Sequence, residues 1–491
     1  MIYFGKNDIR NRLRRAACCL AAATTISACI KEELPAPDDG EGQPTRVEVA
    51  LELPAMEIQT RAMMSEKDDS QVNTLWVGTF LASTGVKSGS AFSEVNRSDQ
   101  HVFHTLTLDT KSGPSRIAGV ANVDDNYGTT DNETLLEDLR EAGKRPTQAG
   151  YYTLRDLLEV VRTWEQYRSI RAAHINPANV SSFAPNLIMA GIYHSAQTSD
   201  PAAWNNEATV TIPSSQNGKV TLPGAIHLRR LLAYVRFDIR WEAAAGITDL
   251  EVDLKSWRVV HNPTYSYLHE QAANAGDAAW ERSYAASNLS RNFESTTRPG
   301  DARTYRTFDF YQYENRHTGL DGVTVYADRE REHKLDGGGN SGIYASLCPE
   351  AEDGPANRAT YVEIEAEVAY ATTIDGVRVD RTGTARYCVH LGYCEGADEA
   401  ARARDFNCRR NTKYTYTMVI RGLDKIVVEA RREGEELPGA EGEVFDTYEQ
   451  TIDLDAHYGT FNIQLSNRER ASLDYTIQAP YDDTARQIVS S

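Results

Sequence analysis

The sequence predicts a mainly β protein made of two consecutive antiparallel β-sandwich domains, with a helical insertion in the first. Many short segments alternate apolar and polar residues with a period of two, as half-buried strands do. β-Branched and aromatic residues, including 25 Tyr, fill these segments, and turn residues separate them. At 491 residues the chain is long enough for two or three hydrophobic cores.

The first 28 residues have the layout of a secretory signal peptide. Five basic residues end at Arg15, an apolar run covers 16–28, and small residues stand directly before Cys29. The run is shorter than the ~20 residues that span a bilayer. Small residues followed by Cys resemble the lipobox of bacterial lipoproteins, which predicts a lipid on Cys29. The alternative is an ordinary signal peptide in which Cys29 is incidental.

The next segment, 29–45, is acidic and rich in Pro and Gly, which predicts a disordered tether. Its Lys31-Glu32-Glu33 resembles the signal that exports some Bacteroidales lipoproteins to the cell surface. Without residues 1–28 the chain has 47 basic and 70 acidic residues. Such a charge repels phosphate backbones, so we expect no nucleic-acid partner. No later window is apolar enough for a transmembrane helix.

We place the first β-sandwich domain at 46–223. Its first strand is Val47–Leu53, where Val and Leu alternate with Glu. A polar stretch containing Arg61-Ala62 follows, and then a strand at Val72–Phe80 around Trp76. Further strands are expected at His101–Leu108, Ser115–Val123, Asn186–Gly191, Ala208–Ile212 and Lys219–Leu222.

The helical insertion consists of two predicted helices. Asp131–Arg145 begins with a capping residue and continues with Leu at helical spacing. A second helix starts at Thr153 and presents an apolar face, with Trp164 on one flank. Such a face is typical of a core helix and not of a cofactor site.

Pro223-Gly224 suggests a boundary, so we place the second β-sandwich domain at 224–465. It opens with one long strand, Ile226–Arg240, and includes a polar excursion at 264–340. Further strands are expected at Thr248–Asn262, Gly342–Leu347, Tyr361–Tyr370, Arg386–Leu391, Lys413–Ile420, Asp424–Ala430, Thr451–Leu454 and Thr460–Leu465. Residues 466–491 contain one more strand-like piece, Leu473–Gln478, which is either a donor strand or the start of a third domain.

The residues expected in the mature chain show no catalytic or metal-binding pattern. The sequence has no G-x-S-x-G, HExxH, Walker or GxGxxG motif, and we therefore predict no enzyme and no cofactor. Four Cys after Cys29 are too sparse for a disulfide scaffold. Export permits oxidation, so Cys388 with Cys408 or Cys394 is a candidate disulfide. The alternative is that these are small core residues.

The second half of the chain contains a set of short phrases in a fixed order. They include Leu228-Arg229-Arg230, Ser256-Trp257, Ala359–Ile364, Arg410–Thr417, Arg421–Ile426, Pro438–Gly442 and Leu454–Tyr458. Together these phrases resemble the fimbrillin-like lipoproteins of Bacteroidales, in a branch whose domain has no known function. These proteins include pilus subunits and their accessory, anchor and tip relatives. The resemblance covers about 226–465 well and 45–222 weakly.

The resemblance implies two transthyretin-like β-sandwich domains and assembly of pili by strand exchange. In polymerising subunits an Arg-specific protease removes the first strand, and a terminal segment of a neighbour fills the gap. The matching residues here are the strand Val47–Leu53, the scissile candidate Arg61-Ala62 and the segment beyond Tyr458. Anchor-type relatives keep the first strand. The expected partners are other fimbrial subunits, the outer membrane through Cys29, and a host or bacterial surface ligand.

The predicted function is therefore that of a surface lipoprotein of a fimbrial system, acting as a subunit, anchor or tip adhesin. An alternative is a glycan-binding lipoprotein of a nutrient-uptake system. Sugar binding requires exposed Trp or Tyr along a concave surface, whereas a fimbrial protein can bury them in its sandwiches. Trp76 and Trp257 lie within predicted strands, which favours the fimbrial function.

Overall fold

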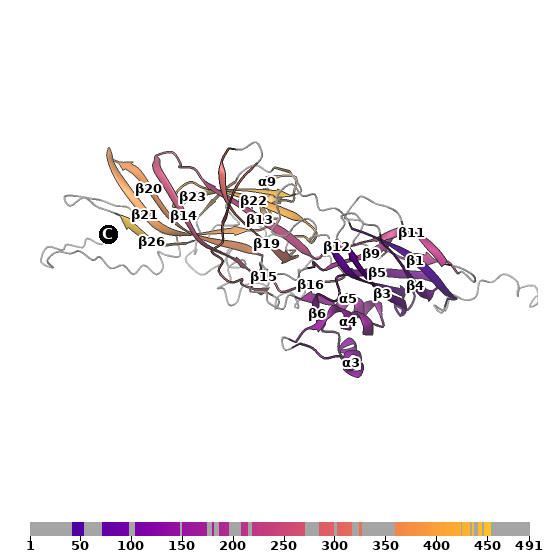
Figure 1. The fold of residues 1–491 in the computed structure, drawn as a ribbon. Coiled ribbons are helices and arrows are strands. Elements are labelled where there is room, and N and C mark those ends of the chain that lie inside the picture. Colours follow the sequence, from indigo (N-terminus) through magenta and orange to yellow (C-terminus); the bar gives the residue numbers. More distant parts are fainter. Residues whose placement is uncertain are drawn as a thin grey trace, which may run out of the picture.

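A computed structural model of the chain confirms a mainly β protein. The molecule is elongated, with strands gathered at both ends and helices beside the first group (Figure 1). We refer to residues 42–230 as the N-terminal half and 231–452 as the C-terminal half. The structure describes residues 42–53, 71–97, 104–147, 150–173, 179–180, 186–195, 208–214, 219–270, 284–298, 302–316, 324–326, 359–423, 425–432, 435–436, 440–443 and 446–452.

The N-terminal half contains one nine-stranded sheet. Its main path is β3-β2-β5-β9-β11-β1-β4, with β10 paired to β5 and β12 to β9. The predicted alternation is observed, because apolar side chains of β1, β2 and β5 enter a shared core. The strands are β1 (Pro44–Glu52), β2 (Val72–Leu81), β3 (Lys87–Arg97), β4 (His104–Lys111), β5 (Gly113–Ala121), β9 (Met189–His194), β10 (Val210–Ile212), β11 (Lys219–His227) and β12 (Arg229–Arg230).

The helical insertion contains three helices instead of two. They are α3 (Glu133–Glu141), α4 (Leu154–Val160) and α5 (Trp164–Ser169). Of the two candidate caps that the sequence offers, Asp131 and Asn132, it is Asn132 that caps the first helix. Thr153, where the sequence predicts the start of the second helix, is its N-cap. Trp164 does not lie on the second helix, because the Thr163 and Gln166 side chains form a capping box that starts a new helix there.

The C-terminal half packs two sheets over a large core. One sheet has the order β18-β19-β13-β22-β23-β24 with β25 on β23, and the other is β14-β20-β21-β26. Trp257 of β14 stacks on Phe308 of β19 at 4.2 Å between ring centroids. The elements are β13 (Leu232–Trp241), β14 (Ile247–Val260), β15 (Asn262–Pro263), β17 (Tyr284–Ala285), β18 (Glu294–Thr297), β19 (Thr304–Tyr313), β20 (Tyr361–Ile374), β21 (Val377–His390), α9 (Glu399–Ala403), β22 (Lys413–Ile420), β23 (Lys425–Arg432), β24 (Glu435–Glu436), β25 (Ala440–Glu443) and β26 (Asp446–Ile452).

The prediction of purely antiparallel sheets is wrong in two places. β1 runs parallel to β11, and β13 runs parallel to β22. Each half thus begins with a strand that pairs in parallel with a late strand of the same half. Short hairpins can connect only antiparallel strands, so both parallel pairs are made between segments far apart in the chain.

Two further predictions need correction. The segment Ile226–Arg240 is not one strand, because it ends β11, forms β12 and begins β13. The boundary placed at 223 therefore falls within β11, and the strand pairing changes sheet between Arg230 and Leu232. The excursion at 264–340 contains β19, whose buried aromatic residues form part of the core. The Arg, Asp and Gln residues of β19 interrupt its apolar pattern, so the sequence did not indicate a strand there.

A small sheet joins the two halves. β16 (Tyr265–Tyr267) pairs with β8 (Arg171–Ala173), which also pairs with β6 (Tyr127–Thr129), and β6 pairs with β7 (Tyr152–Thr153). One apolar core extends across this contact and includes Trp76 and Tyr167 from one half and Leu232 and Tyr311 from the other. We call this region the junction.

Candidate functional site

The first strand, β1, lies inside the N-terminal sheet. It pairs with β4 over Pro44–Leu51 and with β11 from Arg46 to Glu52. Both edges of β1 are therefore hydrogen-bonded to neighbouring strands. The chain leaves β1 for the next strand only after residue 53. We call the position between β4 and β11 the β1 slot.

Apolar side chains of β1 fill the slot. Val47, Val49 and Leu51 are almost completely buried, and Leu53 follows them into the same core. Gly119 of β5 makes room for Ile226 of β11, since a Cβ on Gly119 would lie 3.1 Å from Ile226 Cγ2, whereas Leu51 Cδ2 of β1 would be at an ordinary contact distance of 3.5 Å. Other core side chains of the slot are Leu106, Leu108, Leu222, Ile226 and Leu228.

Charged residues hold β1 on both outer sides. Arg46 donates to the Asp109 carboxylate of β4 at 2.7 Å and 3.1 Å. Glu48 accepts from Lys219 Nζ at 2.7 Å and from Thr221 Oγ1 at 3.0 Å, both on β11. The hydrogen bond from Lys219 lowers the pKa of Glu48, with a further contribution from Thr221. These contacts are exposed to solvent and add little stability, but they select the register of the strand.

At its far end β1 contacts a buried histidine. The Glu52 carboxylate lies 3.3 Å from His227 Nδ1, and the Glu52 carbonyl accepts a hydrogen bond from Leu228 N at 2.9 Å. Burial lowers the pKa of His227, partly offset by Glu52, while the nearby His194 lowers it further. The ring centroids of the two histidines are 6.2 Å apart.

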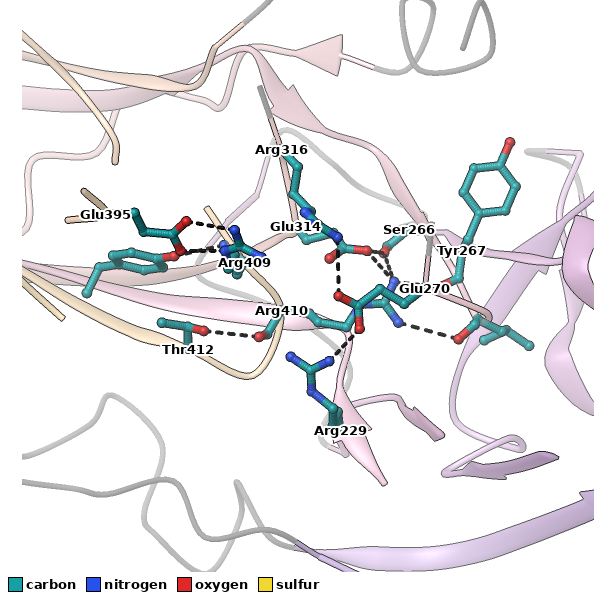
Figure 2. A network of polar contacts seen from close by, with 12 residues as sticks. Arg229, Ser266, Tyr267, Glu270, Glu314, Arg316, Glu395, Arg409, Arg410 and Thr412 are labelled. Atoms are coloured by element: carbon teal, nitrogen blue, oxygen red, sulfur yellow. Dashed lines mark hydrogen bonds and ion pairs between the residues drawn. The ribbon is translucent and has the colours of Figure 1, made fainter. Parts of the chain in front are cut away.

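A second polar centre lies at the junction (Figure 2). Arg410, just before β22, is buried and forms an ion pair with the buried carboxylate of Glu314. It also donates to Tyr267 O at 2.8 Å and to Ser266 Oγ at 3.2 Å, and both of these residues belong to β16, the strand that pairs with β8. Burial raises the pKa of Glu314, but the charge and hydrogen bond of Arg410, together with the charges of Arg316 and Arg229, outweigh burial and keep this pKa below its ordinary value.

Glu270 extends the network. It forms ion pairs with Arg229 of β12 and, at 3.3 Å, with Arg316. Its carboxylate also lies 4.0 Å from Arg410 Nε. The network thus connects the ends of β12, β16 and β19 with the start of β22, so it fixes the N-terminal half to the C-terminal half.

A small cavity connects this network with the end of β1. His227 and Arg410 both line it, although one contacts β1 and the other belongs to the C-terminal half. The slot and the junction are therefore adjacent. The full lining is Ala190, Gly191, Ile192, His227, Arg229, Leu268, His269, Glu270 and Arg410.

The predicted site residues lie apart from this centre. Cys29, Arg61 and Ala62 lie outside the described residues, so lipidation and cleavage stay predictions. Cys388, Cys394 and Cys408 are thiols without a disulfide between them, and a disulfide stays a prediction. Cys388 and Cys408 are buried, and burial raises the pKa of Cys408 well above its ordinary value.

Sequence reasoning missed the polar residues of the slot end and the junction. Arg410 begins one of the phrases that carry the resemblance, Arg410–Thr417, but nothing in the sequence pattern shows that it is buried. Glu270 and Glu314 lie in the segment interpreted as a polar excursion. A charged residue directly before a strongly alternating strand, as Arg410 is before β22, was the only signal available.

Within the described ranges, no group of three or more His, Cys, Asp or Glu is placed to hold a metal ion. Among the helices of that same part of the chain, none is long and apolar enough to cross a membrane.

No protein-family model matches the sequence, and no curated protein sequence matches it. Solved structures do resemble it at low identity. The tip fimbrial protein of Porphyromonas gingivalis, truncated at its C-terminus, is 13% identical, with 79% of this chain and 99% of that chain covered and a TM-score of 0.39. A fimbrilin from the same organism is 13% identical, with 77% and 91% covered and a TM-score of 0.40.

The fimbrial anchor protein of Porphyromonas gingivalis is a third similar structure. It is 10% identical, with 80% of this chain and 99% of that chain covered and a TM-score of 0.33. These TM-scores are too low to assign a role. The solved structures to which this chain is similar thus include a tip fimbrial protein, a fimbrilin and a fimbrial anchor protein.

Proposed function

We propose that this chain is a lipid-anchored cell-surface protein of a fimbrial system, acting as a subunit, anchor or tip adhesin, and that β1 is the strand exchanged in assembly. The observation that carries the proposal is the place of β1 between two strands of the body, β4 and β11. Its chain connection to β2 contains Arg61-Ala62. One cut there would leave β1 held only by non-covalent contacts.

The energetics favour exchange over simple loss. Burying Val47, Val49, Leu51 and Leu53 contributes roughly 6–12 kcal/mol, at about 1.5–3 kcal/mol for each side chain. An empty slot would expose this apolar surface together with the unpaired N–H and C=O groups of β4 and β11. A strand from another subunit would restore both kinds of contact.

The C-terminal segment offers a strand of matching pattern. Leu473-Asp474-Tyr475-Thr476-Ile477-Gln478 follows the same alternation as Val47–Glu52. Asp474 then takes the position of Glu48, where Lys219 and Thr221 can donate to its carboxylate. We propose this segment as the donor strand.

The order of the features along the chain separates the roles. Cys29 and β1 both precede Arg61, so one cut would release the lipid and the first strand together. An uncut chain would stay attached to the outer membrane as an anchor, with other fimbrial subunits as partners. A cut chain would polymerise or occupy the tip and present a surface to a host or bacterial ligand.

We also propose that the two halves are transthyretin-like sandwich domains. Each half has its own core, and in each the first strand pairs in parallel with a late strand of the same half. This common arrangement supports two related units.

The experiment uses an Arg-specific protease. Wild-type chain treated with the protease should form ladders that resist mild SDS, whereas Arg61→Ala should stay monomeric. Arg145→Ala, at another exposed arginine, is the matched control and should form ladders. Clean cleavage at Arg61 without any ladder would refute the strand-exchange proposal.

The glycan-binding alternative is less well supported. Trp76, Trp164 and Trp257 are buried in cores, and Trp241 is 38% exposed at the end of β13. Among the described residues, the cavity at the junction is lined by charged residues, aliphatic residues, Gly191 and two histidines, and by no Trp or Tyr. Neither feature gives a sugar a stacking surface.

A further inference from the structure

The segment 227–231, which we call the relay segment, touches the β1 slot at one end and the junction at the other. Leu228 N donates to Glu52 O, and the Leu228 side chain shares a core with Leu51 and Leu53. The next residue, Arg229, forms an ion pair with Glu270 in the junction network. Leu231 N then donates to Ile188 O at 3.0 Å.

The backbone around the relay segment has no spare room. A Cβ on Gly191 would lie 2.0 Å from the carbonyl oxygen of His227, so these two backbones are in close contact. Gly191 and His227 line the same cavity as Arg229, Glu270 and Arg410. A shift of His227 would therefore move atoms that the network contacts, because packed interiors transmit displacements.

We infer that the relay segment couples the β1 slot to the junction, so that the two halves are held rigidly only while a full-length strand fills the slot. This inference rests on the proposed function, since it takes β1 as removable. Loss of β1 removes the acceptor of Leu228 N, the carboxylate beside His227 and the apolar neighbours of Leu228. A buried donor without an acceptor favours movement toward water, and the relay segment carries that movement to Arg229.

The same contacts specify what can refill the slot. A strand that ends at the level of Ala50 would pair with most backbone N–H and C=O groups of β4 and β11 that face the slot. It would not supply the contacts that Glu52 makes with the relay segment. A strand that reaches Glu52 supplies the carbonyl for Leu228 N and an acceptor near His227. Strand length at this end therefore decides whether the junction becomes rigid.

The test is hydrogen exchange on the full chain in detergent, with a recognition site for a sequence-specific protease inserted after Ala62. The readouts are the amides of Leu231 and Leu268, whose hydrogen bonds to Ile188 and Ile170 cross the junction. Cleavage and removal of β1 should speed exchange at both by about tenfold or more. The amide of Ile364, inside the C-terminal core, should not change.

Synthetic peptides provide the matched control. A peptide of residues 44–53 should restore slow exchange at both junction amides. A peptide of residues 44–50 should restore slow exchange of the amides that line the slot, such as that of Leu106. The amide of Leu231 should still exchange fast. Equal restoration by both peptides would overturn the inference, as would unchanged junction exchange after β1 has been removed.

A second test needs no cleavage. Glu52→Ala in the intact chain should speed exchange of the Leu231 amide by about threefold. Glu48→Ala removes the contact with Lys219 near the start of β1 and should leave the exchange rate of the Leu231 amide unchanged. Equal effects of the two variants would also overturn the inference. The proposed function would fail in a different readout. Cut chains would then form no ladder, independently of the exchange rates of the junction amides.

Discussion

The carbonyl of Glu52, the last residue of β1, accepts a hydrogen bond from the amide of Leu228 at 2.9 Å. Leu228 begins the short connection between the sheet of the N-terminal half and the first strand of the C-terminal half. The first strand therefore contacts the part of the chain on which the arrangement of the two halves depends. Changes in β1 should affect more than the edge of one sheet.

Shortening a single buried side chain of β1 should destabilise the fold, although the strand is short. Leu51→Ala removes a side chain that is 1% exposed and should lower the free energy of unfolding by about 2–5 kcal/mol. Val377→Ala, at a side chain that is 63% exposed, should change it by less than about 0.5 kcal/mol. Urea denaturation followed by fluorescence measures both. Similar values for the two variants would show that β1 is not part of the core.

The buried ion pair at the junction should show strong coupling. Arg410→Met leaves Glu314 buried without its cation and should cost about 3–5 kcal/mol of the free energy of unfolding. The double variant Arg410→Met with Glu314→Gln should recover part of that loss, because the uncompensated charge is gone. Additive losses in the same urea experiment would show that the two residues act independently.

Acid should weaken the fold through His227. Burial lowers the pKa of His227 below 6.5, so the unfolded chain takes up a proton before the folded chain does. Stability should therefore be constant above pH 6.5 and should fall as the pH drops from 6.5 toward the lower pKa of the folded state.

His227→Gln should flatten this pH dependence in thermal unfolding between pH 7 and 5. The carboxylates of Glu48 and Asp109, whose pKa values the facing Lys219 and Arg46 lower, act at more acidic pH and so do not obscure the effect. Parallel curves for wild type and His227→Gln would contradict the assignment of the pH dependence to His227.

The lipid prediction has a direct check in cells. Cys29→Ser should abolish labelling by a palmitate analogue, because the thiol is the acceptor of the lipid. Cys388→Ser, at a buried thiol on β21, is the control and should be labelled like wild type. Labelling that persists in Cys29→Ser would refute lipidation at this residue.

The sequence predicted the elements whose pattern is local. The alternation at Val47–Leu53, the cap at Asn132 and the strand Lys413–Ile420 all follow from side-chain periodicity and turn chemistry. It did not predict the parallel pairing of β1 with β11 or of β13 with β22. Those pairings depend on which distant strands meet, and periodicity contains no such information.

The junction was missed for a different reason. Glu270 and Glu314 stand among polar residues, and charged side chains of this kind are normally exposed. Their burial depends on Arg410, which follows Glu314 by 96 residues and Glu270 by 140 residues in the chain. A pattern read along the chain cannot show that charges so far apart neutralise one another.

The central claim is that β1 leaves its slot so that another strand can enter. Arg46 of β1 faces Asp109 of β4 directly, and both are exposed. Cys at both positions should form a disulfide, since opposed residues of antiparallel strands lie within its reach. The measurement is ladder formation by Arg46→Cys/Asp109→Cys after treatment with an Arg-specific protease, with Arg46→Cys alone as control. The account predicts monomers until a reductant opens the disulfide, and ladders afterwards. Ladders of equal extent before and after reduction would contradict it.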